Sequence, residues 1–388
     1  MHISMRQGLG QGVVLVTLLA AMALAAGRAQ ADEPKGFLEK IHRHITRTST
    51  ITENGDLNPY AIIVAPVSAG KIQQGDVLVD NFNNLSNLQG TGTTIVDFNP
   101  ATKKLTTFAK LPQRLAGCPG GTGLTTAMTM LKSGWVIVGS TPSTDGTTGT
   151  KGDGCLIVLD TNGEVVTTWT GPNINDPWGN MAVIDNGTKA TLFVSMSGFD
   201  IPSPNVRDPQ TGYAVTVNKA TVLRLDLAIS DGKPPTIVSQ TVIANGLSQR
   251  ADRDVFLIGP TGLALSPDGG TLYVSDALNN QIVAISDAAT RKDSASTGRI
   301  VTKDGLLKRP LSLALAPNGH LLACNGVNGQ VVEVDPASGK QLYAQWIDAD
   351  AAQSPPGNGD LFGIAMTPDG KGFYYVEDDV NTIVEATE

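Results

Sequence analysis

The feature that most constrains this chain is an internal repeat in its second half. Three segments share one pattern, a short apolar stretch that ends in Pro-Asp-Gly or Pro-Asn-Gly: Gly262–Gly269, Ser312–Gly319 and Gly363–Gly370. Proline presets such a turn, and glycine supplies the positive φ that it requires. Successive segments start about 50 residues apart, which is the length of a four-stranded propeller blade and excludes a coiled coil.

Two further strands follow each turn. The second strands are expected at Leu272–Asp276, Leu321–Asn325 and Phe373–Glu377, and the third at Gln281–Ile285, Gln330–Val334 and Thr382–Ala386. The first half has the same order in weaker form. Its three units have strands at 60–64, 77–81 and 94–98, at 123–130, 135–140 and 155–159, and at 178–183, 192–196 and 221–225. The sequence therefore predicts an all-β fold, a six-bladed β-propeller of four-stranded blades.

The last unit stops after its third strand at Glu388. A missing fourth strand would leave an unpaired sheet edge. Residues between Ile41 and Ile51, rich in Thr, Ile and Arg, are the expected donor, so that the N-terminal segment closes the ring. We therefore divide the chain into a signal peptide at 1–31, an N-terminal segment with the closing strand at 32–58, and the propeller at 59–388.

The first residues have the pattern of a secretory signal. Arg6 precedes an apolar run from Val13 to Ala26, and Ala29-Gln30-Ala31 fits a small-x-small cleavage site. The run is shorter than the roughly 20 residues that a membrane-spanning helix needs. We expect a periplasmic or secreted protein, cleaved after Ala31, with no membrane span in the mature chain.

Charge and cysteine content narrow the partners and the redox state. The formal net charge is -8, and no basic run is present, which argues against nucleic acid as a partner. Export permits a disulfide. Cys118 and Cys155 both fall in glycine-rich loops and are the expected pair, whereas Cys324 lies in an apolar strand and is expected to be a buried free thiol.

The repeat resembles the NHL-repeat family of propellers. The segment that carries the resemblance reads PTGLALSPDGGTLYVSDALNNQIV from Pro260 onwards, and the likeness is clear over 256–388 and looser over 59–250. It implies the fold rather than an activity, because this architecture carries enzymes, binding modules and scaffolds.

Loop lengths predict where a site lies. The long loops between second and third strands are at 82–93, 141–154 and 197–220, so blades one to three carry them on one face. We call this the long-loop face and expect a small molecule or a protein to bind there.

The ends of the second strands form a candidate metal site. Aligned by the repeat, they are Asn81, Ser140, Met196, Asp276, Asn325 and Glu377. Oxygen ligands suit Ca²⁺ or another divalent cation, and we assign Asn81, Asp276, Asn325 and Glu377 as its ligands. The chemistry is similar to that of the gluconolactonase and senescence-marker propellers, whose own metal motifs are not matched in this chain. The alternative is structural, since this Asp or Asn commonly caps a turn in NHL repeats.

A ligand rim is predicted from the starts of the innermost strands. Its members are Tyr60, Trp178 and Phe362, with Asp360 nearby, and the alternative is packing between blades. Acidic groups at Glu377–Asp379 and at Asp348 and Asp350 are typical of solvated loops.

No catalytic residue can be assigned from the sequence. His42, His44 and His320, the histidines after the leader, are not placed for work in the channel, so a Ser-His-Asp triad lacks its base. Two hypotheses remain, and whether the chain is an enzyme stays open. One is a ligand- or protein-binding scaffold, and the alternative is a metal-dependent, lactonase-like hydrolase with a channel cation site. A quinoprotein-type dehydrogenase is a weaker third.

Overall fold

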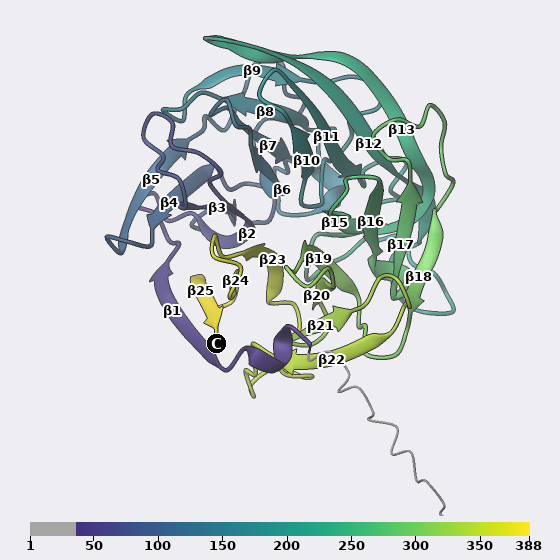
Figure 1. Cartoon of the computed structure of the whole chain (residues 1–388). Helices are drawn as coiled ribbons and strands as arrows, with labels where there is room; N and C mark the ends of the chain where they lie inside the picture. The colour runs from purple at the N-terminus through teal and green to yellow at the C-terminus, as the bar shows by residue number, and fades with distance from the viewer. Residues whose placement is uncertain (1–35) are drawn as a thin grey trace, which may run out of the picture. The chain divides into compact units, whose positions relative to one another are not determined.

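The computed structural model describes residues 36–388, so the expected signal peptide and residues 32–35 lie outside it. The described residues form six antiparallel sheets around a central axis, which is the expected six-bladed propeller (Figure 1). Within 36–388 helix is limited to three short 3₁₀ segments, η1 (Leu38–Lys40), η2 (Thr148–Thr150) and η3 (Ala277–Asn279). None of the helices in this part of the chain has the length and apolar character needed to cross a membrane.

Five blades have four strands each, in sequence order from the axis outwards except in blade six. Blade one is β2 (Leu57–Val64), β3 (Val77–Asn83), β4 (Thr94–Asn99) and β5 (Lys104–Lys110); blade two is β6 (Leu124–Met130), β7 (Val136–Ser140), β8 (Cys155–Leu159) and β9 (Val165–Trp169). Blade four is β15 (Pro260–Leu265), β16 (Thr271–Asp276), β17 (Gln281–Ser286) and β18 (Arg299–Lys303); blade five is β19 (Pro310–Leu315), β20 (Leu321–Asn325), β21 (Gln330–Val334) and β22 (Gln341–Trp346). Blade six is β23 (Leu361–Met366), β24 (Phe373–Glu377), β25 (Thr382–Thr387) and β1 (Arg43–Ser49).

Blade three departs from the repeat. Its strands are β10 (Ala182–Asp185), β11 (Lys189–Met196), β12 (Val217–Ser230), β13 (Lys233–Ala251) and the short β14 (Leu257–Ile258). The extra residues lengthen the β12–β13 hairpin, which extends along the outer rim, and add no further blade (Figure 1). The innermost strand also begins later than the expected 178–183, at Ala182, and Gly179 before it lies directly against the backbone of Thr261 in blade four.

The repeated turns have the expected conformation. Gly269, Gly319 and Gly370 have φ values of +70°, +83° and +69°, the left-handed region that glycine enters without steric cost. In each turn the glycine N–H donates to the carbonyl three residues earlier, at 2.8, 2.9 and 2.9 Å. The turn chemistry therefore fixes the first hairpin of blades four to six.

The N-terminal segment closes the ring, as the sequence predicts. Strand β1 pairs antiparallel with β25, from Arg43 opposite Thr387 to Ser49 opposite Thr382. This pairing covers the edge that the truncated last repeat would leave open (Figure 1).

The core lies between neighbouring blades. Inner strands approach so closely that a Cβ on Gly262 would meet the Leu311 carbonyl, and one on Gly363 would meet the Tyr60 carbonyl. The apolar residues on both faces of each sheet are therefore buried against the next blade. The free thiol of Cys324 is one of these buried groups, as expected.

Candidate functional site

The two innermost strands of every blade have the same register at one level. Each second-strand end lies opposite the start of its inner strand, in the pairs Asn81–Pro59, Ser140–Leu124, Met196–Pro177, Asp276–Pro260, Asn325–Pro310 and Glu377–Leu361. The alignment taken from the sequence repeat is therefore correct in register. We call this level the channel mouth.

The structure places the four predicted metal ligands in four different blades. The Asn81 amide donates to the Thr50 carbonyl at 2.9 Å, and the Asn325 amide donates to the Leu306 carbonyl at 3.0 Å. Asn325 Oδ1 also accepts the Lys308 N–H at 2.8 Å. These two asparagines hold the segments that lead into their own blades.

The two predicted acidic ligands are also held locally. Asp276 Oδ2 accepts from the Asn279 and Gln281 amides, both at 2.8 Å, and Glu377 Oε2 accepts from the Thr382 hydroxyl at 3.1 Å. Side chains of a strand project from the faces of its sheet, and here those faces pack against other blades. No contact joins the four predicted residues into one cluster, and their role as a metal site stays a prediction.

The predicted aromatic rim is buried as a plug. Tyr60, Trp178 and Phe362 are at most 2% exposed. Tyr60 stacks on Phe362 with ring centroids 3.9 Å apart, and Phe256 stacks on Trp178 at 6.1 Å. We call these residues, with Phe82, the aromatic plug. Their contact with a ligand stays a prediction.

Phe256 reaches the plug from the connection between β13 and β14, at the end of blade three. This connection crosses the channel mouth, and Gln89 of blade one donates to the Asp254 carbonyl at 2.6 Å. The only sequence signal is the apolar run from Val255 to Ile258 inside a loop. Burial, with the carboxylates of Asp378 and Asp252 nearby, raises the pKa of Tyr60, so its hydroxyl keeps its proton.

The long loops of blades two and three enclose a polar cleft on this face. It has a volume of about 590 Å³, and its walls include Asp145, Thr147, Ser203, Asn205 and Arg253. Asp145 orders the glycine-threonine loop by accepting from the Thr147 N–H at 2.9 Å. The expected disulfide is present, with 2.07 Å between the sulfur atoms of Cys118 and Cys155.

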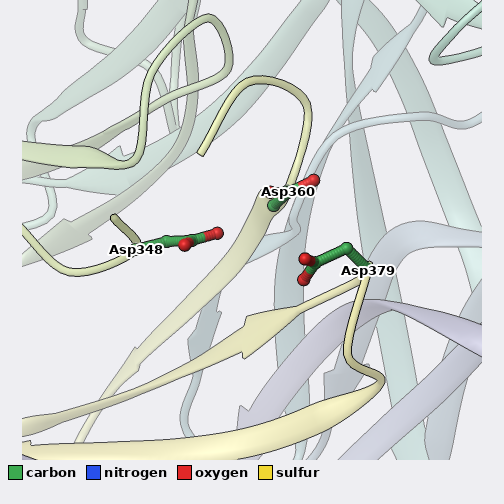
Figure 2. Close-up of side chains that lie close together, drawn as sticks. All are labelled: Asp348, Asp360 and Asp379. Carbon is green, nitrogen blue, oxygen red and sulfur yellow. The ribbon is translucent and has the colours of Figure 1, made fainter. Parts of the chain in front are cut away.

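Three carboxylates converge beside the channel mouth. Asp348 follows β22, Asp360 immediately precedes β23, and Asp379 lies in the turn between β24 and β25. One oxygen of each lies within 4.8 Å of the others, and Figure 2 shows the three groups directed toward one space. Asp348 is 8% and Asp360 is 4% exposed, whereas Asp379 is exposed. We call these residues the aspartate cluster.

The backbone around the aspartate cluster is fixed by close contacts. The Asp348 N–H donates to the Gly329 carbonyl at 3.1 Å, and the Asp378 N–H donates to the Asp360 carbonyl at 3.1 Å. A Cβ on Gly329 would overlap the Asp348 carbonyl, so only glycine permits this approach. The convergence of the three aspartates could not be predicted from the repeat, because Asp348 lies in a connection outside it.

The negative charges of the aspartate cluster have no positive partner in the described part of the chain. None of the ion pairs among residues 36–388 involves its carboxylates. Burial, with the neighbouring Asp348 carboxyl, raises the pKa of Asp360 to about 7, and the same two causes raise that of Glu377 to about 7. Burial and the Asp360 charge also raise the pKa of Asp378. The expectation that Glu377–Asp379, Asp348 and Asp350 lie in solvated loops does not fit Asp348, which is 8% exposed.

One family model matches part of the chain. Residues 249–350 match the family model described as SMP-30/Gluconolactonase/LRE-like region. No curated protein matches the chain in sequence.

Solved structures of similar fold include a gluconolactonase from Xanthomonas campestris, 14% identical, with a TM-score of 0.53 over 90% of each chain. The calcium-binding protein regucalcin from Agrobacterium tumefaciens is 12% identical, with a TM-score of 0.51 over 89% of this chain and 93% of that chain. A luciferin-regenerating enzyme is 13% identical, with a TM-score of 0.50 over 86% and 93%. The chain is thus related in architecture to the gluconolactonase and senescence-marker propellers.

Proposed function

We propose that this protein is an exported, cation-dependent hydrolase of the lactonase type, which acts on a small molecule at the long-loop face. The observation that carries the proposal is the match of residues 249–350 to the gluconolactonase family model. That span covers blades four and five and ends within the segment that contributes Asp348 to the aspartate cluster. The comparisons favour this hypothesis over a non-catalytic scaffold.

The residues at the mouth offer the groups that lactone hydrolysis requires. Hydrolysis needs a base for the attacking water and a positive or hydrogen-bonding group for the developing oxyanion. Glu377, whose pKa is about 7, is suited to accept a proton near neutral pH. The Tyr60 hydroxyl also keeps its proton, but its side chain is buried in the aromatic plug. No histidine is required for this scheme.

The donor set suits a hard cation. Carboxylate and amide oxygens at the mouth are the ligands that such a cation prefers, and when bound it polarises a carbonyl or activates a water molecule. Two sets of residues are available to hold it, namely the four predicted ligands and the aspartate cluster.

The direct test is a hydrolysis assay on the purified mature chain. Lactones of sugar acids and of aliphatic hydroxy acids are followed by acid release, with Ca²⁺, Mg²⁺, Mn²⁺ or Zn²⁺ added singly after treatment with EDTA. We expect turnover that EDTA abolishes and one cation restores, and Glu377→Gln should lower kcat at least about 100-fold. Asp369→Asn, on the opposite face of blade six, is the matched control. Absence of turnover with every cation and lactone would refute the proposal.

A further inference from the structure

The two candidate ligand sets differ in how many oxygens remain free. Asn325 uses its amide N–H and its Oδ1 in hydrogen bonds to the connection between blades four and five, and Glu377 accepts from Thr382. Asn81 Oδ1 and Asp276 Oδ1 are buried without a partner, but they belong to blades one and four, whose second strands are not adjacent. The predicted set therefore has two unpartnered oxygens, one in blade one and one in blade four, and no hydrogen bond joins them.

The aspartate cluster has its free oxygens in one place. Asp348 Oδ2 and Asp360 Oδ2 are buried and have no hydrogen-bond partner. Asp348 Oδ1 already accepts the Asp350 N–H at 3.0 Å, which leaves Oδ2 free, and Figure 2 shows this carboxylate directed toward the other two. Burial of an unpaired carboxylate is costly, so each such oxygen requires either a proton or a cation.

Gln353 adds an uncharged amide beside the cluster. Its amide is among the groups that act on the pKa of Asp360, after burial and the Asp348 carboxyl, so its side chain lies next to this carboxylate. Gln353 Oε1 is also buried without a partner. The segment between blades five and six thus supplies Asp348, Gln353 and Asp360, and blade six adds Asp379 from its turn.

We propose that Asp348, Asp360 and Asp379 form a Ca²⁺ site at the junction of blades five and six. The inference rests on the proposed function only in assigning this ion as the cation used in hydrolysis. The ligands are oxygens, with no imidazole or thiolate among them, which selects against Zn²⁺ and copper. Loop-borne carboxylates suit the larger, more variable coordination shell of Ca²⁺ better than the strict octahedron of Mg²⁺.

One side of the proposed Ca²⁺ site is open to solvent. Asp348 and Asp360 form a buried floor, whereas Asp379 is exposed. An ion held here keeps coordination positions on the solvent side for water or for a substrate oxygen. The same ion joins the segment after blade five to the start and the turn of blade six, so its binding stabilises the ring.

The test measures Ca²⁺ binding without any substrate. The full mature chain is treated with EDTA, dialysed and titrated with CaCl₂ or MgCl₂ by calorimetry, and Tm is followed in parallel. We expect one equivalent of Ca²⁺, weaker Mg²⁺ binding and a rise in Tm with CaCl₂, because a ligand of the native state stabilises by mass action. Asp379→Asn changes an exposed residue, so the variant should fold, and it should weaken Ca²⁺ binding at least about tenfold.

Two controls separate the ligand sets. Asp276→Asn alters the predicted set alone and should leave Ca²⁺ affinity unchanged, as should Asp369→Asn. Loss of binding in Asp276→Asn with retention in Asp379→Asn would overturn the inference in favour of the predicted set. Absence of any Ca²⁺ binding would also overturn it, and the two buried aspartates would then hold protons.

Failure of the inference and failure of the proposed function give different results. If Ca²⁺ binds and depends on Asp379 but no lactone is hydrolysed, the site stands and the hydrolase does not. If hydrolysis needs Ca²⁺ but is unchanged in Asp379→Asn, the hydrolase stands and the site lies elsewhere.

Discussion

The last two blades bury carboxylates in two opposite ways. Glu333 of β21 is fully buried and accepts four hydrogen bonds: from the Phe37 N–H at 2.8 Å, the Leu38 N–H at 2.9 Å, the Asn318 amide at 3.0 Å and His320 Nδ1 at 2.6 Å. Burial alone would raise its pKa, but the Leu38 and Phe37 N–H groups, with His320 and Asn318, outweigh burial and lower it. This carboxylate is charged and satisfied.

Asp360 is buried to a similar degree without such donors. Its Oδ2 has no partner, and burial with the Asp348 carboxyl raises its pKa to about 7. The buried carboxylate of Glu333 therefore attaches the N-terminal segment, whereas that of Asp360 has an unpartnered oxygen at the channel mouth. A charge that the fold itself does not compensate indicates a place where something else binds.

The largest expected effect on stability is at Glu333, whose carboxylate has all its hydrogen bonds. Glu333→Ala leaves the N–H groups of Phe37 and Leu38 buried without an acceptor, so we expect a loss of about 3–5 kcal/mol in the free energy of unfolding. Glu333→Gln keeps one acceptor oxygen and should cost about 1–2 kcal/mol. Urea denaturation followed by circular dichroism measures both values.

A partly exposed ion pair between the closing strand β1 and its neighbour β25 provides the control. Arg47 and Glu385 lie 2.5 Å apart with side chains that are 25% and 15% exposed. Glu385→Ala should cost less than about 1 kcal/mol, as exposed pairs usually do. Equal losses for Glu333→Ala and Glu385→Ala would show that the four hydrogen bonds to Glu333 do not hold the N-terminal segment.

The next expected effect, that of Asp360→Asn on the free energy of unfolding, changes sign when Ca²⁺ is added. In EDTA, Asp360→Asn removes one of several like charges, so we expect the variant to be about 1–2 kcal/mol more stable than the parent chain. With saturating CaCl₂ the order should reverse, because the variant has lost a ligand. Urea denaturation in the two buffers measures the change. A variant less stable than the parent chain in both buffers would mean that Asp360 is a structural residue like Glu333.

The sequence could predict the blades, the closing strand and the disulfide, but not the aspartate cluster. The Pro-Asp-Gly repeat determined blade length and the register that sets Asp276 and Glu377 at one level, because those are properties of strands and turns. The closing strand and the Cys118–Cys155 pair followed from an unpaired edge and from loop positions. These inferences needed only local structure and the repeat.

The aspartate cluster depends on three segments that meet only in the folded ring. Asp348 lies in an irregular connection, Asp360 precedes a strand and Asp379 lies in a turn, so no spacing in the sequence relates them. The repeat also gave no side-chain directions. It placed Asn81 and Asn325 correctly along their strands, yet their amides bond to neighbouring backbone carbonyls.

The smallest expected effect tests whether an unsatisfied carboxylate must bind a cation. Asp97 of β4 is buried with Oδ1 unpartnered, and burial, with the Asp76 carboxylate, raises its pKa to about 7. Asp76 already accepts from the Gln73 N–H at 2.6 Å and from the Asn99 amide at 2.7 Å. Asp97 therefore has one carboxylate neighbour rather than two, and a proton suffices to neutralise it.

Because the folded pKa of Asp97 exceeds its unfolded value, its stabilising contribution is complete at low pH and is lost as pH rises through about 7. With CaCl₂ present to saturate the aspartate cluster, we expect the parent chain to lose about 1 kcal/mol between pH 6 and 8 from this group. Asp97→Asn should remove that loss, as measured by urea denaturation at each pH. If CaCl₂ alone removed this loss of stability, Asp97 would itself bind the cation. The number of neighbouring carboxylates would then not distinguish buried acids that bind a cation from those that hold a proton.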